Sequence, residues 1–350
     1  MKISILETES GDRELFKQRL GEHTLQFPGA PEKVAADAEV VSTFIYSRID
    51  AAFLNAHSQL KLVATRSTGY DHIDHAECAR RGITVSYVPS YGDNTVAEHT
   101  FALLLALSRR LREALSSNQK KQFSFESLRG FELKGKTLGV VGAGRVGLHT
   151  IKLGNAFGMR SIAYDARPLP HIAEVIGFTY CTLRRLLRES DIISLHIPLN
   201  PRTHHLLNQK TLSICKRGVL IINTARGALI DTNTLIEMLD NGQVGGAGID
   251  VLEDERSMQT ETMHRIGEQI VSRLQSGISA NEAREHSSRR VDELHGLMRN
   301  QQLLSRPNVI FTPHIAFNSV EAIERINLCT VENIRAYAKG KPVNVVSAGS

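Results

Sequence analysis

The segment Gly142-Ala143-Gly144-Arg145-Val146-Gly147 has the spacing G-x-G-x-x-G, which is typical of loops that bind a dinucleotide. Alone this spacing is weak evidence in a chain with 26 glycines, so the neighbouring sequence must decide. A strand pattern that begins at Thr137 runs into the glycines, a helix pattern follows, and a second strand pattern ends at Asp165. In such a unit the first glycine makes a tight turn, the second lets the backbone approach a pyrophosphate, and the third packs helix against strand. We therefore predict a dinucleotide site at this segment.

The acidic residue that ends the second strand pattern predicts which dinucleotide binds. The carboxylate of Asp165 can accept hydrogen bonds from both ribose hydroxyls and would repel a 2′-phosphate. NAD is therefore favoured over NADP, although Arg167 close by weakens that preference. Two other interpretations stay open at this point: a glycine-rich turn that binds nothing, and a methyltransferase with a similar loop.

The elements that must position this loop form two series of strand and helix patterns. Apolar strand patterns of the first series lie at 2–6, 40–45, 60–66 and 83–88, and those of the second at 137–142, 161–165, 192–196, 219–223, 246–251 and 309–312. Strands this apolar are typical of parallel sheets that helices cover on both faces. The chain is therefore predicted to be an α/β protein with doubly wound parallel sheets.

Three segments lie outside that alternation. A long helix is predicted over 94–112, followed by a polar connection at 116–136. Residues 256–306 interrupt the second series with mixed charge and two stretches of helical periodicity, which predicts an inserted pair of amphipathic helices. A terminal helix over 319–339 is expected to pack back on the first series.

Composition and charge exclude several classes of protein. A length of 350 residues suggests two domains, and 41% apolar with 23% charged residues is ordinary for a folded, soluble protein. The longest apolar run, 101–107, is too short to cross a membrane, and the first residues lack a signal peptide. Four cysteines without paired spacing indicate reduced thiols and a cytoplasmic protein. The net charge of +5 is scattered, so nucleic-acid binding is not expected, whereas an anionic small substrate fits.

Five segments beside the glycine loop are similar to those of a known family. They are Arg66 to Asp74, Val96 to Thr100, Asn223 to Gly227, Gly248 to Glu255 and Thr312 to Phe317. In them the chain resembles the D-isomer-specific 2-hydroxyacid dehydrogenases over nearly its whole length. The resemblance implies a Rossmann-like NAD-binding domain, residues 100–317, inserted into a flavodoxin-like substrate domain, residues 1–99 and 318–350. It also implies an active site between the domains, helices 94–112 and 319–339 that cross between them, and a homodimer.

The resemblance assigns the chemistry to Arg226, Glu255 and His314. A guanidinium at Arg226 would hold a 2-keto carboxylate or its carbonyl oxygen by a two-pronged contact. Imidazole at His314 would deliver a proton to the keto oxygen, and the carboxylate of Glu255 would stabilise the imidazolium. Glu253 and Asp254 stand beside Glu255, so its assignment rests on the family's spacing from Asp250.

The remaining assignments line the cofactor and the substrate. The resemblance places His196, Pro198, Thr203, Thr224, Ala225 and Asp250 beside the cofactor, with Asp250 near the nicotinamide amide. Backbone N–H groups of Thr68 and Gly69 would bind the substrate carboxylate. The aromatic side chains of Tyr46, Tyr91 and Phe317 would line the substrate's side chain, although each is also a reasonable core residue. No metal site is expected, and the acidic and histidine-rich segment 71–75 is interpreted as loop structure.

The function implied is NAD-dependent reduction of a short 2-keto acid, with pyruvate expected first, to the D-2-hydroxy acid. Gly92-Asp93 follows Tyr91 where family members that act on pyruvate commonly have Ser-Pro, which leaves the substrate open. Glyoxylate or hydroxypyruvate reductase and D-3-phosphoglycerate dehydrogenase are alternatives within the family. An NAD-sensing transcriptional corepressor with this fold is the alternative of another class.

Overall fold

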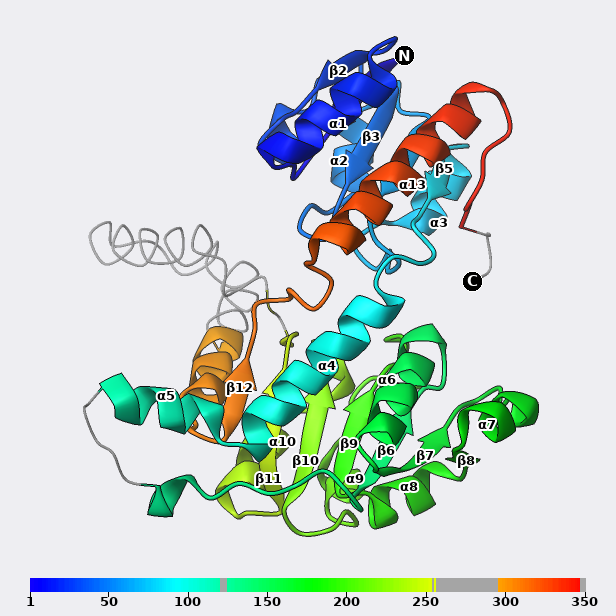
Figure 1. The fold of residues 1–350 in the computed structure, drawn as a ribbon. Helices are drawn as coiled ribbons and strands as arrows, with labels where there is room; N and C mark the ends of the chain where they lie inside the picture. Colours follow the sequence, from blue (N-terminus) through cyan, green and yellow to red (C-terminus); the bar gives the residue numbers. More distant parts are fainter. Residues whose placement is uncertain (120–124, 254, 256–294, 347–350) are drawn as a thin grey trace, which may run out of the picture. The chain divides into compact units, whose positions relative to one another are not determined.

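The computed structural model describes residues 1–119, 125–253, 255 and 295–346 (Figure 1). The chain forms two compact units, Met1–Tyr91 with Phe317–Ser350, and Gly92–Ala316. The boundaries expected at 99/100 and 317/318 thus fall at 91/92 and 316/317. Helix α4 (Asp93–Ser108) belongs to the second unit and helix α13 (Val320–Ala338) to the first, and the apolar face of each helix enters the core of its own unit.

The first unit contains a five-stranded parallel sheet. Its strands are β1 (Lys2–Ile5), β2 (Thr24–Gln26), β3 (Val40–Thr43), β4 (Leu62–Thr65) and β5 (Thr84–Ser86). Their order in the sheet is β2-β1-β3-β4-β5, and all neighbouring strands run parallel. This is the flavodoxin-like order that the family resemblance implies.

Helices cover both faces of the first sheet because strand side chains alternate between two cores. Val41, Val63 and Val85 pack on one face with α2 (Ala51–Ala56) and α3 (His75–Arg80). The other face buries Ile3, Ile5, Val40 and Leu62 against α1 (Ser10–Leu20) and α13. The packing of α13 on the first series of strands is as predicted (Figure 1). A short 3-10 turn, η1, spans Pro31–Lys33.

The second unit contains a seven-stranded parallel sheet. Its strands are β6 (Thr137–Val141), β7 (Arg160–Tyr164), β8 (Thr179–Tyr180), β9 (Ile192–Leu195), β10 (Val219–Asn223), β11 (Val244–Ile249) and β12 (Val309–Phe311). The order is β12-β11-β10-β9-β6-β7-β8, so β6 lies between β7 and β9. This is the Rossmann order with a seventh strand, and the strand order reverses at β6 and β9.

The helices of the second unit are divided between two cores. Helices α4, α6 (Arg145–Ala156) and α7 (Pro170–Ile176) cover one face. The other face is covered by α8 (Leu183–Glu189), α9 (Gln209–Leu212), α10 (Thr232–Asp240) and the helical residues 295–304. Shorter elements are α5 (Leu111–Gln119), η2 (Glu126–Leu128) and η3 (Gly227–Leu229).

The single helix predicted over 94–112 is two helices, because Arg110 adopts the left-handed φ of 52° between α4 and α5. The edge strands β2 and β8 were not predicted. Most of the predicted insertion, 256–294, lies outside the described residues. Among the helices that the structure describes, none has the length and apolarity needed to cross a membrane.

Candidate functional site

The glycine segment forms a turn between β6 and α6 at the end of the strand. Gly142 has φ of +97°, and a Cβ built on it would lie 2.5 Å from the carbonyl oxygen of His196. A Cβ on Gly147 would lie 1.9 Å from the carbonyl oxygen of Gly142, so only glycine lets the helix start against the turn. Gly144 is the N-cap residue of α6, and a Cβ there would meet nothing within 4 Å. The backbone at this helix N-terminus is therefore uncovered at Gly144, which is what the close approach of a pyrophosphate would need.

Asp165 follows β7 and is held beside that turn. One carboxylate oxygen accepts a hydrogen bond from the Ala143 backbone N–H, and the other accepts one from the Arg167 N–H, both at 2.8 Å. Each oxygen has a second lone pair that a ribose hydroxyl can use. The carboxylate thus has the charge and the placement to favour NAD over a cofactor with a 2′-phosphate.

Two predicted cofactor residues flank the start of α6. The Arg145 side chain is 64% exposed and lies 3.7 Å from the carboxylate of Asp93. Val146 is half-buried, and its carbonyl accepts a hydrogen bond from the Thr150 hydroxyl within the helix. Both residues therefore lie in the first turn of the helix that begins at the glycine segment.

The predicted residues after β9 form a fixed loop next to the glycine turn. The backbone N–H of His196 donates to the Val141 carbonyl, and its Nε2 lies 2.8 Å from the Ser194 hydroxyl. Burial lowers the pKa of His196 to about 3, so its imidazole is neutral. Farther along, the Thr203 hydroxyl donates to the Pro198 carbonyl at 2.7 Å and closes the loop.

Thr224, Ala225 and Arg226 follow β10 in a turn held by Asn223, a residue that the sequence reasoning did not single out. The Asn223 side chain accepts a hydrogen bond from the Ala225 N–H at 3.0 Å and donates one to the Arg226 carbonyl at 2.8 Å. The Thr224 hydroxyl lies 3.0 Å from the hydroxyl of Thr100 on α4. Asparagine is common in turns, so its position at the end of a strand pattern is the sequence signal that could have predicted this role.

Gly227 brings the arginine turn against the segment that carries Glu255. A Cβ on Gly227 would lie 2.0 Å from the Leu252 carbonyl carbon and 2.2 Å from the Glu253 nitrogen. The two backbones are therefore in contact, which requires glycine at this position. The Arg226 side chain is half-buried, and its Nη1 donates to the Ala225 carbonyl at 2.8 Å.

His314 and Glu255 form a hydrogen-bonded pair. Nδ1 of His314 lies 2.9 Å from a carboxylate oxygen of Glu255, and the side chains are 21% and 39% exposed. Glu253 does not compete for the histidine, because its carboxylate accepts from His205 at 2.8 Å and from the Thr232 hydroxyl at 2.9 Å. Asp254 lies outside the described residues. Among the described acidic neighbours, the structure thus pairs Glu255 with the histidine.

The turn of His314 is shaped by Asp250, whose side chain is fully buried. Its carboxylate accepts hydrogen bonds from the Thr312 hydroxyl and from the backbone N–H groups of Ile315 and Ala316, and His99 Nε2 lies 3.4 Å away. Burial alone would raise the pKa of Asp250, but these hydrogen bonds outweigh it and lower the pKa below its usual range. His314 itself has a left-handed φ of +54°, and its N–H donates to the Asp250 carbonyl at 2.7 Å. Asp250 therefore supports the histidine turn, a role that the sequence did not indicate.

The predicted aromatic residues belong to the first unit and share a cluster with Phe44. The rings of Phe44 and Phe317 meet edge to face with centroids 4.8 Å apart, and Tyr46 lies 6.3 Å from Phe44. Tyr91 packs against the same cluster, and its carbonyl accepts two hydrogen bonds from the Arg325 guanidinium. Tyr46 is 47% exposed, whereas Phe317 is buried. Phe44 was predicted only as a strand residue.

The loop of Thr68 and Gly69 follows β4 and is held by hydroxyl groups. The Ser67 hydroxyl donates to the Gly69 carbonyl at 2.6 Å, and the Thr68 hydroxyl donates to the Val88 carbonyl at 2.7 Å. Arg66 before it is buried, and its guanidinium donates to the carbonyls of Leu6 and Glu7. These hydrogen bonds tie the loop to the segments at Leu6 and Val88.

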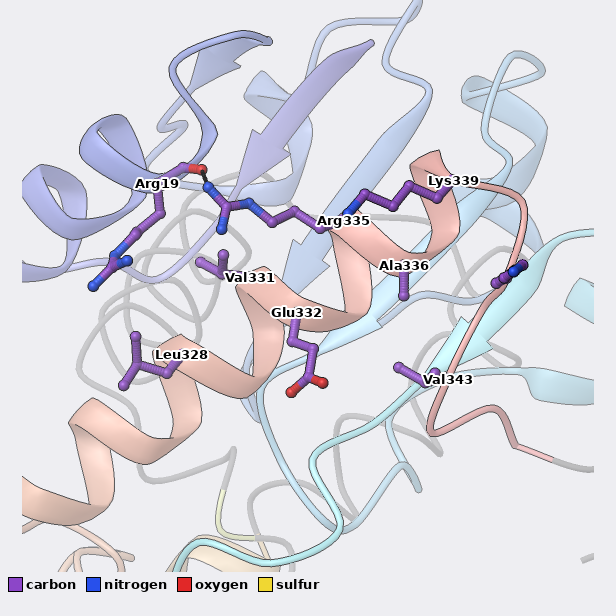
Figure 2. Close-up of a pocket in the computed structure, with 9 residues that line it drawn as sticks. Arg19, Leu328, Val331, Glu332, Arg335, Ala336, Lys339 and Val343 are labelled. Carbon is purple, nitrogen blue, oxygen red and sulfur yellow. Dashed lines mark hydrogen bonds between the residues drawn. The ribbon is translucent and has the colours of Figure 1, made fainter.

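A hollow of about 480 Å³ lies along α13 in the first unit (Figure 2). Arg335 donates a hydrogen bond to the Arg19 carbonyl at its edge, and Leu328, Val331 and Val343 supply apolar lining. None of the predicted site residues lines it. The hollow therefore does not add to the candidate site.

The second unit contains three groups that can do chemistry. They are the glycine turn at the start of α6, the imidazole of His314 paired with the Glu255 carboxylate, and the Arg226 guanidinium after β10. Parallel strands bring these groups to one edge, because each follows the carboxyl end of β6, β10, β11 or β12. The imidazole and carboxylate can exchange a proton with a bound oxygen, and the guanidinium can hold an anion.

Comparisons with known proteins agree with this chemistry. Residues 101–316 match the family model described as D-isomer specific 2-hydroxyacid dehydrogenase, NAD binding domain. D-lactate dehydrogenase of Escherichia coli is 33% identical over 97% of this chain and 98% of its own length. Glyoxylate reductase of Thermococcus litoralis is 35% identical over 90% of this chain and 85% of its own length. The crystal structure of D-lactate dehydrogenase from Aquifex aeolicus, complexed with NAD and lactic acid, superimposes with a TM-score of 0.81 at 33% identity and covers 99% of this chain and all of its own.

Proposed function

Because the chain belongs to the D-isomer-specific 2-hydroxyacid dehydrogenases and contains their NAD-binding domain, we propose that it interconverts pyruvate and D-lactate with NAD. The family makes the chain an oxidoreductase acting on 2-hydroxy acids, and the choice of pyruvate is the proposal. It is supported by the likeness to two D-lactate dehydrogenases over almost the full length of this chain. A homodimer in the cytoplasm is part of the same proposal.

The observation that carries the proposal is the contact between His314 Nδ1 and Glu255. A carboxylate on Nδ1 stabilises the imidazolium and orients the ring, which assigns the proton transfer to Nε2. In the direction of reduction, Nε2 gives its proton to the keto oxygen as that oxygen gains charge. In the reverse direction, the neutral ring accepts the hydroxyl proton.

The other residues bind and orient. The bound cofactor supplies or accepts the hydride, and Gly144 at the N-terminus of α6 and Asp165 would hold its pyrophosphate and its adenosine ribose. Arg226 would bind the substrate's carboxylate or keto oxygen through its planar guanidinium. On the first unit, the N–H groups of Thr68 and Gly69 would bind the carboxylate, and Tyr46, Tyr91 and Phe317 would contact the substrate's side chain.

Glyoxylate is the second candidate substrate. Its support is the 35% identity to a glyoxylate reductase. Glyoxylate carries hydrogen where pyruvate carries a methyl group, and one methyl group in an apolar pocket is worth only about 10- to 200-fold in selectivity. Both acids are therefore expected to react. The ratio of the kcat/KM values for pyruvate and glyoxylate decides which of the two is the preferred substrate.

The test is NADH oxidation with pyruvate, glyoxylate, hydroxypyruvate, phenylpyruvate and 2-ketoisocaproate, followed by chiral analysis of the product. The proposal expects the highest kcat/KM with pyruvate and a product that is D-lactate. A higher kcat/KM with glyoxylate would show that glyoxylate, not pyruvate, is the preferred substrate. Tight NADH binding without turnover of any acid would favour the corepressor class instead.

A further inference from the structure

We propose that His204, His205 and Glu253 form a binding site for Zn²⁺ or a similar transition-metal ion on the second unit. This inference does not depend on the proposed function, because neither the hydride-transfer chemistry nor its residues use this cluster. The cluster was not expected from the sequence, where the two histidines lie about fifty positions before the glutamate.

The three side chains present one ligand atom each, and these atoms all lie within 4.8 Å of one another. Nε2 of His205 is 2.8 Å from a carboxylate oxygen of Glu253, and the imidazole rings of His204 and His205 stack with centroids 3.9 Å apart. His204 is exposed and the other two are half-buried. The cluster therefore has a partly enclosed base and an open side through which an ion can enter.

The two half-buried ligands are fixed by contacts of their own. His205 has a left-handed φ of +49°, its N–H donates to the Ala228 carbonyl, and its carbonyl accepts from the Asn208 side chain, both at 2.8 Å. The other carboxylate oxygen of Glu253 accepts a hydrogen bond from the Thr232 hydroxyl at 2.9 Å. Hydrogen bonds to ligating side chains are what orient the ligands of protein metal sites.

The donor set selects the class of ion. Two imidazole nitrogens and one carboxylate oxygen suit Zn²⁺, Co²⁺ or Ni²⁺, whereas Mg²⁺ and Ca²⁺ prefer sites built from oxygen alone. Zn–N and Zn–O bonds of about 2.0–2.2 Å put the ligand atoms of a tetrahedral site about 3.3 Å apart. Binding therefore requires the three ligand atoms, which lie within 4.8 Å of one another, to adjust to this spacing, and a water molecule would complete the fourth position.

The positive charge of Arg299 lies close to the proposed site and should weaken the binding of a metal ion. Its removal therefore tests the proposal, because the expected change in affinity has a definite direction. Nη2 of Arg299 lies 3.8 Å from the second oxygen of Glu253, within reach of any ion bound there. Like charges at that separation repel, so removal of the guanidinium should tighten metal binding about fivefold. If the three side chains serve only to stabilise the fold by hydrogen bonds, removal of the Arg299 guanidinium should not tighten metal binding.

The experiment is titration of the purified, metal-free protein with Zn²⁺ by calorimetry and with Co²⁺ by visible absorption. We expect the wild type to bind one ion per chain more than His204→Ala, with the absorption bands of tetrahedral Co²⁺. Zn²⁺ should also raise the Tm of the wild type and leave that of His204→Ala unchanged. His171→Ala, on the exposed part of α7, is the matched control and should bind like the wild type.

Two further variants make the result decisive. Glu253→Gln should lose the site, and Arg299→Met should bind Zn²⁺ about fivefold more tightly. The inference is overturned if the wild type and His204→Ala bind Zn²⁺ alike, or if Arg299→Met binds more weakly while it remains folded. Since His204 is exposed, His204→Ala is expected to fold, so a failure of Glu253→Gln to fold does not remove the test.

Discussion

Replacing Glu255 by Gln tests whether the carboxylate beside His314 serves proton transfer. The substitution keeps the size of the side chain and removes its charge, so Nδ1 of His314 loses a charged partner at 2.9 Å. Glu255 also receives a long backbone contact from the Leu252 N–H at 3.4 Å, which an amide oxygen can replace. We therefore expect the fold to survive and the chemical step to slow.

The magnitude follows from the distance and the exposure. A hydrogen bond to a charged group contributes about 1.5–3 kcal/mol when it is buried. The Glu255 side chain is 39% exposed, so water screens its charge. We therefore expect a smaller contribution of about 1–2 kcal/mol from this hydrogen bond. In the reduction assay His314 must carry the proton before it donates it, and the carboxylate stabilises that imidazolium, so its loss should appear in kcat as a fall of about 5- to 30-fold.

The assay is steady-state NADH oxidation with saturating keto acid, beside fluorescence titration of NADH. Glu237→Gln, on the exposed face of α10 in the same unit, is the matched control and should retain wild-type rates. The dissociation constant for NADH should be the same in all three proteins. Wild-type kcat in Glu255→Gln would refute the reasoning, as would a loss confined to NADH affinity.

Four other substitutions test separate parts of the structure. Gly144→Ala should leave Tm unchanged and weaken NAD binding at least about tenfold in a fluorescence titration, since its Cβ meets only open space where a pyrophosphate fits; an unchanged dissociation constant would contradict this site. Gly147→Ala should lower Tm, because its Cβ would lie 1.9 Å from a carbonyl oxygen, and a normal Tm would contradict this close approach of helix and turn. Glu253→Gln should lose about 1–3 kcal/mol in urea unfolding yet keep kcat, whereas a selective loss of kcat would give it the role assigned to Glu255. The pKa of His196 is about 3 in the folded protein, whereas the histidine of the unfolded chain binds a proton below about pH 6.5. The free energy of unfolding should therefore fall on acidification between these values, by about 2 kcal/mol from pH 6.5 to pH 5. His196→Asn should show a shallower fall, and an equal slope would contradict the lowered pKa.

The fold was predictable where strands are apolar and of ordinary length. Both sheets and their α/β class follow from runs such as 219–223, which is buried throughout. The strands β2 and β8 have only three and two residues, too few for a hydrophobic period to show. The break at Arg110 carries neither glycine nor proline, so nothing in the sequence marks it.

The site was predictable where chemistry depends on spacing along the chain. The glycine turn and Asp165 could be assigned because they form one local unit, and the structure places them side by side. Glu255 was assigned from the family's spacing, whereas the contacts of Glu253 with His205 and of Glu255 with His314 join distant segments, and no local pattern contains them. The support of the histidine turn by Asp250 likewise joins segments far apart in sequence, and only the folded sheet reveals it.

His314→Asn isolates the proton transfer assigned to the histidine, because it removes the proton donor and keeps a polar side chain of similar reach. The measurement is kcat for keto-acid reduction, taken together with the dissociation constant for NADH on the same preparation. We expect kcat to fall about 100- to 10,000-fold while NADH binds as in the wild type. Turnover at the wild-type rate in His314→Asn would contradict this expectation.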